Sequence, residues 1–329
     1  MRKDIKKVGL IGLGQQMECD LTPAVLNSKG IYDVIAICDK EPEKINIAAK
    51  SFPNAKAYLD YKELIRSEKE LDFVIISLPH YLHFEVTREC IKNGVAVFKE
   101  KPLTKSISEA NKIVKEAINK KIHVYTITKR NFYQSYKRAK ELLSELGHIY
   151  QYTAKHFVTG GNIHEGWKST FAESGGGVVI NLAYHLLDIL ISFFGPVSNG
   201  NMYSSNTGNQ DYKYEVDDSA TALMLHENGT YGSFQFNCYT GVKQESIEIN
   251  GTKGTLVVTK TDVYLYSQNG KEMLHETYKT DGVAAISEAL EKFYDSNFEE
   301  VKNNLLHHQK IMQAINMLYK NSKLISKKL

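Results

Sequence analysis

The sequence predicts an α/β protein of two domains, a doubly wound parallel sheet followed by a mostly antiparallel sheet with helices on one side. Three observations predict this class. The chain has 329 residues, enough for two separate cores. Its first part alternates short apolar runs with helical periods, the pattern of βαβ units. Its second half carries strand pairs joined by Asn-Gly dipeptides, the strongest short hairpin signal.

Short runs rich in β-branched residues mark the strands of the first domain. Runs that are apolar throughout suit strands buried on both faces of a parallel sheet. Helical periods between them include Leu82–Lys92 and Ser108–Asn119. We expect the first domain to span residues 1–127 and the second residues 128–329. The predicted strands are Val8–Ile11, Val34–Cys38, Phe73–Leu78, Val95–Phe98 and His123–Ile127.

The second half opens with a long helical pattern over Val178–Phe194, which Gly195-Pro196 ends. Helical patterns near Ile286–Asn303 and Leu305–Tyr319 close the chain. Between these helices the pattern predicts an antiparallel sheet. The predicted hairpin turns are Asn228-Gly229, Asn250-Gly251 and Asn269-Gly270.

Composition argues against several classes of protein. A net charge of +3 gives no electrostatic case for nucleic acid or a membrane surface. The basic start is followed by a brief, glycine-broken apolar run, which indicates a first strand and not a signal peptide. The four cysteines are far apart and lack Cys-x-x-Cys spacing, so we expect no metal site and reduced thiols in the cytoplasm.

A glycine loop follows the first predicted strand and should open a helix. Gly12 and Gly14 allow a tight turn and let backbone amides approach a pyrophosphate at the helix N-terminus, and the loop continues through Gln15 and Gln16. Met17 occupies the position that is usually Gly or Ala, which predicts a slightly displaced helix. An ordinary strand-to-helix turn remains the alternative.

Asp39 ends the second predicted strand, further from the glycine loop than the usual spacing of about 20 residues. A carboxylate there can accept both ribose hydroxyls of NAD and would repel a 2′-phosphate. We therefore expect NAD, with NADP less favoured, although the cation of Lys40 could tolerate the phosphate. A turn residue that caps the next helix is the alternative for Asp39.

Two further motifs follow the third and fourth predicted strands. Ser77-Leu78-Pro79 ends the third, and His83 follows it near a helix start, at the cofactor or as a plain cap. Glu100-Lys101-Pro102 follows the fourth, at the edge where doubly wound sheets bind their ligands. A lysine there can supply positive charge to a reacting hydroxyl, and Glu100 can orient it or bind the nicotinamide ribose.

The helical pattern after Gly175-Gly176-Gly177 carries three polar residues on an apolar background. Asn181, His185 and Asp188 stand at i, i+4 and i+7, which places them on one helix face. A polar stripe of this kind needs partners or a ligand, and the glycines let a ligand or backbone approach the helix start. A solvent-facing stripe is the alternative, and two potential ligands without a third make a metal site improbable.

At this point the chain resembles the Gfo/Idh/MocA family of oxidoreductases over nearly its whole length. The resemblance rests on the motifs above, on Lys129-Arg130-Asn131-Phe132 and on the stretch from Ile249 to Leu256. It implies a Rossmann domain joined to a domain whose large, mostly antiparallel sheet mediates homodimers or homotetramers. It also implies that Lys101 contacts the reacting hydroxyl and that His185 is the acid/base. Position 181 is usually Asp in that family, and Asn cannot carry a proton.

We therefore expect an NAD-dependent dehydrogenase that oxidises a ring hydroxyl of a sugar, sugar derivative or cyclitol. Lys101, His185 and Asn181 would be the catalytic residues, and Arg130, Trp167 and Lys168 could line the sugar pocket. Two alternatives remain open. Some relatives hydrolyse glycosides through transient oxidation, and the Asn at position 181 would also fit a non-catalytic, dinucleotide-binding sensor.

Overall fold

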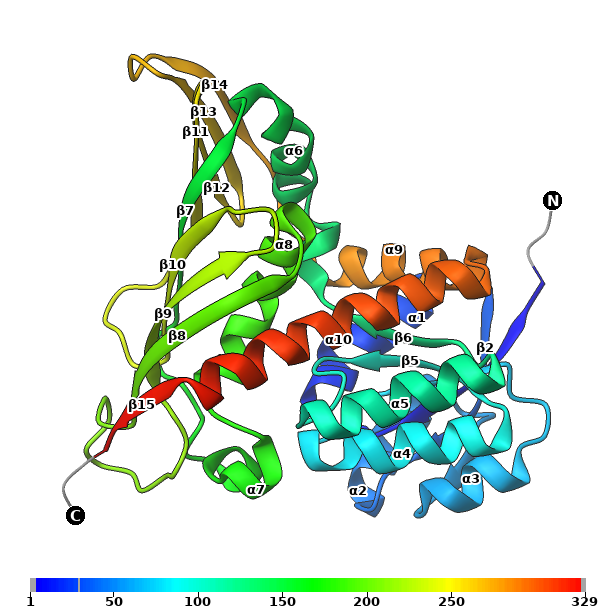
Figure 1. Cartoon of the computed structure of the whole chain (residues 1–329). Coiled ribbons are helices and arrows are strands. Elements are labelled where there is room, and N and C mark those ends of the chain that lie inside the picture. Colours follow the sequence, from blue (N-terminus) through cyan, green and yellow to red (C-terminus); the bar gives the residue numbers. More distant parts are fainter. Residues whose placement is uncertain (1–3, 29, 327–329) are drawn as a thin grey trace. The chain divides into compact units, whose positions relative to one another are not determined.

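The computed structural model describes residues 4–28 and 30–326, which form two compact units (Figure 1). The first unit contains the chain up to Ile127 together with Gly282–Gln309. The second contains Thr128–Asp281 and the residues from Lys310 onward. The two units thus divide after Ile127, and Gly282–Gln309, although far along the chain, belongs to the first of them.

The first unit is built on a six-stranded parallel sheet of order β3-β2-β1-β4-β5-β6. The chain leaves β1 for β2 and β3 on one side and then crosses to β4 on the other, so β1 and β4 are neighbours at the switch point. This confirms the predicted doubly wound sheet. The strands are β1 Lys6–Ile11, β2 Tyr32–Cys38, β3 Lys56–Tyr58, β4 Phe73–Ile76, β5 Ala96–Glu100 and β6 Val124–Ile127.

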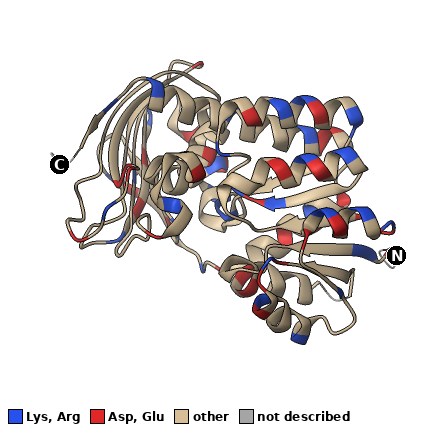
Figure 2. Ribbon diagram, turned by 90° about the horizontal axis from the view of Figure 1, so that it is seen from below, with Lys and Arg blue, Asp and Glu red and all other residues tan. Residues whose placement is uncertain are grey.

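Helices cover both faces of this sheet (Figure 1), and basic and acidic residues are interspersed along them (Figure 2). Burial on both faces explains the uninterrupted apolar runs: all four residues of β4 and of β6 are buried. The helices before residue 127 are η1 Met17–Leu21, α1 Thr22–Leu26, α2 Pro42–Ser51, α3 Tyr61–Ser67, α4 His80–Asn93 and α5 Ile107–Lys120.

Two C-terminal helices complete the first unit's packing: α9, Gly282–Asp295, and the first part of α10, Phe298–Lys320. The Phe293 ring of α9 lies 5.2 Å from that of Phe73 and 5.7 Å from that of Phe98, centroid to centroid. This aromatic contact explains why a segment distant in sequence joins the first unit. The expected break between these helices near residue 304 was wrong, because they separate at residues 296–297.

The second unit contains a nine-stranded sheet of order β14-β13-β12-β11-β7-β10-β9-β8-β15. Its pairs are antiparallel except β10 with β7 and β15 with β8, which confirms a mostly antiparallel sheet. The strands are β7 Ile149–Phe157, β8 Val197–Ser205, β9 Ser219–His226, β10 Tyr231–Asn237, β11 Gln244–Gly251, β12 Gly254–Thr259, β13 Asp262–Ser267, β14 Glu272–Thr277 and β15 Ser322–Ile325.

Helices cover one face of this sheet (Figure 1). The opposite face stays open, and large side chains such as Leu223 and Tyr231 are exposed on it. The helical segments are η2 Lys129–Phe132, α6 Gln134–Leu142, η3 Leu143–Leu146, η4 Gly166–Ser169, α7 Phe171–Ser174, η5 Val179–Ala183 and α8 Tyr184–Phe194. The stretch Phe171–Phe194 is long and apolar enough to cross a membrane, but 72% of its most apolar window is buried within the structure, as in a core helix.

The hairpin predictions were right at two turns and shifted at the third. Gly229 and Gly270 have positive φ in the turns after β9 and β13. Asn250-Gly251 instead ends strand β11, and the turn follows at residues 252–253. A Cβ on Gly251 would lie 2.3 Å from the carbonyl oxygen of Leu146, so close packing and not turn geometry requires this glycine.

Candidate functional site

The glycine loop leaves β1 at the switch point of the parallel sheet. Gly12 has a φ of +84°, and a Cβ there would lie 2.2 Å from the carbonyl oxygen of Ser77, so only glycine fits. A Cβ on Gly14 would meet nothing within 4 Å, which leaves open space beside the loop. Free space and a helix N-terminus together suit a diphosphate. Gln15 is exposed, and the Gln16 amide donates a hydrogen bond to Asp20.

The helix after this loop begins with the π-helical segment η1 instead of a regular α-helix. Met17, its first residue, is 1% exposed and packs into the core. Because Met replaces the usual small residue, the sequence predicted a displaced helix, and this stays a prediction. The observed irregularity is the wide π turn.

Asp39 directly follows β2, at the same edge of the sheet as the glycine loop. Its carboxylate accepts hydrogen bonds from the amide of Leu13 at 2.8 Å and from that of Glu41 at 3.0 Å. The first bond ties Asp39 to the loop. The second closes a turn before α2, whose N-cap residue is Glu41 and which has no side-chain cap, so the alternative of a helix cap was wrong while that of a turn residue holds. The carboxylate is only partly buried, and Lys40 beside it is exposed.

The segments after β4 and β5 reach the same edge, because the strands are parallel. Ser77 donates its backbone N–H to the Ile11 carbonyl, and Leu78 and Pro79 lead into α4. Glu100 ends β5 and is buried, and the partly exposed Lys101 precedes Pro102 through a cis peptide bond. The predicted cofactor residues of the first unit therefore gather at one edge of one sheet.

His83 lies in the first turns of α4 and is 0% exposed. Its Nε2 is 2.8 Å from the Leu78 carbonyl oxygen, and its Nδ1 is 2.7 Å from Nζ of Lys99. The structure thus places the ring behind these loops, bonded to protein atoms. Sequence reasoning missed Lys99, which sits inside an apolar strand and is also 0% exposed. A lysine in such a strand was the available signal.

In the second unit, Asp217 anchors the start of the long helix. It is fully buried and accepts hydrogen bonds from the amides of Gly177 and Val179, each at 3.0 Å, and from the Tyr319 hydroxyl at 2.7 Å. Burial raises the pKa of Asp217, and these bonds oppose the rise. A Cβ on Gly177 would lie 1.8 Å from the Asp217 carbonyl oxygen. This glycine therefore allows backbone to approach the helix start, which is one of the two alternatives, backbone or ligand, that the sequence left open.

The polar stripe divides into residues with different surroundings. Asp188 is fully buried and accepts hydrogen bonds from Thr128 and Asn131, which fix the start of the second unit against α8. Asn181 and His185 are both partly exposed. Asp188 is thus a structural member of the stripe, while Asn181 and His185 remain the candidates for chemistry.

A buried charge cluster lies beside this helix. Arg130 donates to Glu245 through Nε at 2.8 Å and through Nη2, and Tyr136 donates to the same carboxylate at 2.8 Å. Burial raises the pKa of Glu245, but the Arg130 guanidinium outweighs burial and lowers the pKa to about 2. Arg130, expected to line the sugar pocket, is thus held by an internal carboxylate that sequence reasoning missed.

His156 connects that cluster to the helix. Its Nε2 lies 3.2 Å from Nη2 of Arg130, and its Nδ1 lies 3.1 Å from the Leu182 carbonyl oxygen. Nε2 also lies 3.4 Å from a carboxylate oxygen of Glu245, so it faces a donor and an acceptor, while Nδ1 faces an acceptor alone. The His156 and His185 rings meet edge to face, 6.4 Å between centroids. His156 faces inward on β7, and nothing in the sequence distinguished it.

Trp167 and Lys168 lie together in η4, and both are partly exposed. The Lys168 ammonium lies 5.9 Å from the centroid of the Trp167 ring. Burial lowers the pKa of Lys168, and Glu165 opposes that shift. The structure brings these two predicted pocket residues together and pairs them as cation and aromatic face.

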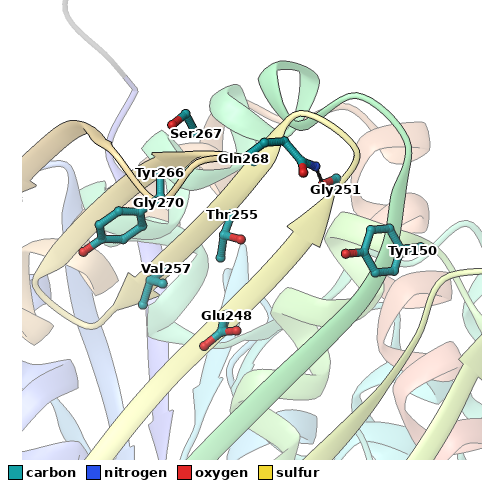
Figure 3. Close-up of a pocket in the computed structure, with 10 residues that line it drawn as sticks. Tyr150, Glu248, Gly251, Thr255, Val257, Tyr266, Ser267, Gln268 and Gly270 are labelled. Atoms are coloured by element: carbon teal, nitrogen blue, oxygen red, sulfur yellow. Dashed lines mark hydrogen bonds between the residues drawn. The ribbon is translucent and has the colours of Figure 1, made fainter.

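A pocket of about 380 Å³ lies elsewhere, on the open face of the second unit's sheet (Figure 3). Its side chains come from neighbouring strands and include Glu248, Val257 and Tyr266, which share a face through the strand register. Its described lining contains none of the predicted site residues. This pocket is therefore separate from the residues that the sequence proposed for binding and chemistry.

Two family models match the chain. The "Oxidoreductase family, NAD-binding Rossmann fold" matches residues 6–127, and the "GFO/IDH/MocA C-terminal domain" matches residues 136–257. An oxidoreductase of uncharacterised function from Schizosaccharomyces pombe is 28% identical over 193 residues, which are 57% of this chain and 52% of that protein. The chain therefore spans about half the length of that relative.

Two further proteins are similar over more of their length. The scyllo-inositol 2-dehydrogenase (NADP⁺) of Bacillus subtilis is 24% identical over 271 residues, 82% of this chain and 71% of that enzyme. A levoglucosan dehydrogenase, solved with NADH and levoglucosan, has the same fold, with a TM-score of 0.85 over 97% of both chains at 17% identity. Together with the two matched domains, these findings show that the chain belongs to the Gfo/Idh/MocA family of NAD(P)-dependent oxidoreductases.

Proposed function

We propose that the protein is a dehydrogenase that transfers a hydride between a ring hydroxyl of a sugar, sugar derivative or cyclitol and a nicotinamide. The observation that carries this proposal is the set of polar groups at one edge of the parallel sheet. The glycine loop, Asp39, Ser77 and Lys101 all follow the carboxyl ends of strands around the switch point. Lys101 is a cation at the place where such sheets bind their ligands.

The residues present fit a dinucleotide. The space beside Gly14 and the helix start suit the diphosphate, Asp39 suits the adenine ribose, and Glu100 suits the nicotinamide ribose. When bound, the nicotinamide supplies the hydride acceptor. Asp39 favours NAD because a carboxylate repels a 2′-phosphate, although the Bacillus relative is named for NADP⁺.

In this proposal Lys101 and His185 are the catalytic residues. The Lys101 ammonium stabilises the negative charge that develops on the substrate oxygen, and His185 accepts the hydroxyl proton. An imidazole suits this role, since its unperturbed pKa is about 6.5. Asn181, one helical turn before His185, donates or accepts a hydrogen bond and orients the substrate. Trp167 and Lys168 also line the proposed substrate site.

The relatives support the proposed substrate class. One is named for an inositol, and a structural neighbour was solved with an anhydrosugar. Both compounds present secondary ring hydroxyls, which is the group that the proposed chemistry needs. We also propose that copies of this chain associate through the open sheet face, where Leu223 is 64% and Tyr203 62% exposed.

A screen of neutral, phosphorylated and nucleotide-linked sugars and cyclitols tests this function, with NAD⁺ and NADP⁺ run in parallel. We expect cofactor reduction with at least one ring polyol and a preference for NAD⁺. If the protein binds neither dinucleotide, or turns over no secondary alcohol in a broad panel, the proposed function is contradicted.

A further inference from the structure

Lys99 is a buried lysine for which the proposed chemistry has no direct use. It lies in β5, two residues before Lys101, and is 0% exposed. Its Nζ lies 3.1 Å from the carbonyl oxygen of Glu100, 2.6 Å from that of Pro102 and 2.9 Å from that of Leu103. These three carbonyl oxygens and Nδ1 of His83, 2.7 Å away, surround Nζ, so its N–H groups are shared among four contacts. Burying a lysine is costly, so its partners must offset that cost.

His83 is also in contact with the Lys99 ammonium. Its Nε2 lies 2.8 Å from the Leu78 carbonyl oxygen and donates to it in the tautomer that carries the hydrogen on Nε2. Its Nδ1 lies 2.7 Å from Nζ of Lys99 and 2.8 Å from the Pro102 carbonyl oxygen. Burial lowers the pKa of Lys99 well below its usual value, and burial and the Lys99 charge together lower that of His83. The 2.7 Å contact between their nitrogens also needs a lone pair on one of the two groups, because an ammonium and an imidazolium can both only donate.

The held carbonyl groups lie on both loops at the proposed nicotinamide site. Leu78 belongs to the loop after β4, and Glu100 and Pro102 flank Lys101 on either side. We propose that the Lys99–His83 pair fixes these two loops and thereby positions Lys101 for the reaction proposed above. Lys99 is then a positioning residue that acts through the backbone. This inference rests on the proposed function, but part of it can be tested without substrate or cofactor.

The variant Lys99→Met keeps most of the side-chain length and removes the ammonium, which leaves three carbonyl oxygens without their donor. We expect backbone amides in residues 77–83 and 100–104 to exchange hydrogen at least about tenfold faster than in the wild type. Lys115→Met, at an exposed position of α5 in the same unit, should leave these rates unchanged. Unchanged exchange in Lys99→Met would overturn the proposal.

Should Lys99→Met fail to fold, His83→Gln decides the question. Its side-chain amide can still donate to Leu78, while the Nδ1 contact to Lys99 is lost. Faster exchange confined to the same two segments supports the pair, and wild-type rates in both segments contradict it.

Ligand affinities distinguish a role of Lys99 in positioning the nicotinamide-site loops from a general loss of structure in the variant. NAD⁺ and ADP-ribose share the diphosphate and adenine half, but ADP-ribose lacks the nicotinamide. By calorimetry we expect Lys99→Met to lower the affinity for NAD⁺ about fivefold or more, while its affinity for ADP-ribose stays within about twofold of the wild-type value. An equal loss for both ligands, or no loss for NAD⁺, contradicts the inference. Failure of the wild type to bind either ligand instead contradicts the proposed function, and the exchange experiment still decides the role of the pair.

Discussion

The two units each bury a cluster of ionisable side chains, and the partners that satisfy these side chains differ. In the second unit, Arg130 faces the carboxylate of Glu245, an opposite charge. In the first unit, Lys99 and His83 are both bases, and besides each other they contact backbone carbonyl groups. The Arg130–Glu245 pair joins strand β11 to η2. The Lys99–His83 pair joins the loops after β4 and β5 to strand β5 and helix α4.

This difference predicts which property of the protein each substitution should change. Removing one member of the Arg130–Glu245 pair leaves a buried charge alone, so the effect should appear in the stability of the second unit. Removing Lys99 leaves backbone dipoles without a donor, so the effect should appear in loop position. Each cluster also lies next to one proposed catalytic residue: Lys99 two positions before Lys101, and His156 against the ring of His185.

The largest effect should come from removing the two proposed catalytic residues that lie next to these clusters. Lys101→Ala and His185→Ala should each lower turnover at least about a thousandfold, because each loses a transition-state interaction of about 4 kcal/mol. NAD⁺ binding should persist. Steady-state rates on the best substrate from the screen, with calorimetry for NAD⁺, measure both quantities.

Exposed residues of the same types serve as controls: Lys115→Ala in the first unit and His148→Ala in the second should keep wild-type rates. Full activity in Lys101→Ala or in His185→Ala would refute that residue's assignment.

A smaller but still large effect is expected on the second unit's stability. Arg130→Met should lower the free energy of unfolding by about 3–5 kcal/mol, because Glu245 then stays buried without its cation. The double variant Arg130→Met with Glu245→Met should cost less than the single one. Urea unfolding followed by circular dichroism measures these changes.

Arg138→Met is the matched control, because Arg138 pairs with Glu276 at a partly exposed position and should cost no more than about 1 kcal/mol. If Arg130→Met costs as little as Arg138→Met, the ion pair has no special role.

The same pair predicts an acid dependence of stability. The pKa of Glu245 is about 2 in the folded protein, against an ordinary value of 4.5. Its contribution is therefore fully present above about pH 4.5 and is lost as the pH falls towards 2, amounting to about 3 kcal/mol. Unfolding measured across this range should show the loss in the wild type, and Glu245→Gln should lack this component. Identical pH slopes in the two proteins would contradict the assignment.

The smallest expected effect concerns cofactor choice. Asp39→Ser removes the carboxylate that should repel a 2′-phosphate, so the affinity for NADP⁺ relative to NAD⁺ should rise about tenfold, or about 1.4 kcal/mol. Dissociation constants for both cofactors measure the ratio. Asp33→Ser, at an exposed position of β2, should leave it unchanged. An unchanged ratio in Asp39→Ser would show that Asp39 serves the protein's own amides, at Leu13 and Glu41, and not the ribose.

The first unit was largely predictable because its signals are local. Uninterrupted apolar runs marked the strands, and Gly12, Asp39 and Lys101 each follow a strand end that chain order alone identifies. Parallel pairing then brings them to one edge. What could not be predicted was the packing of α9, because its contact with Phe73 and Phe98 joins segments about two hundred residues apart.

In the second unit the sequence predicted the mostly antiparallel sheet, two of three hairpin turns and the polar stripe. It missed the partners of Arg130, since Glu245 lies on a strand whose alternation does not distinguish a buried carboxylate from an exposed one. Asn250-Gly251 was wrongly assigned to a turn, because the requirement for glycine comes from its contact with Leu146, which is distant in sequence.

A crystal structure with NAD⁺ and the best compound from the screen tests the central claim most directly. The account predicts that Nζ of Lys101 and a ring nitrogen of His185 both lie about 3 Å from the same substrate hydroxyl. It also predicts that the diphosphate lies on the glycine loop at Gly14. The claim is contradicted if the two side chains contact different parts of the ligand, or if the glycine loop holds no diphosphate.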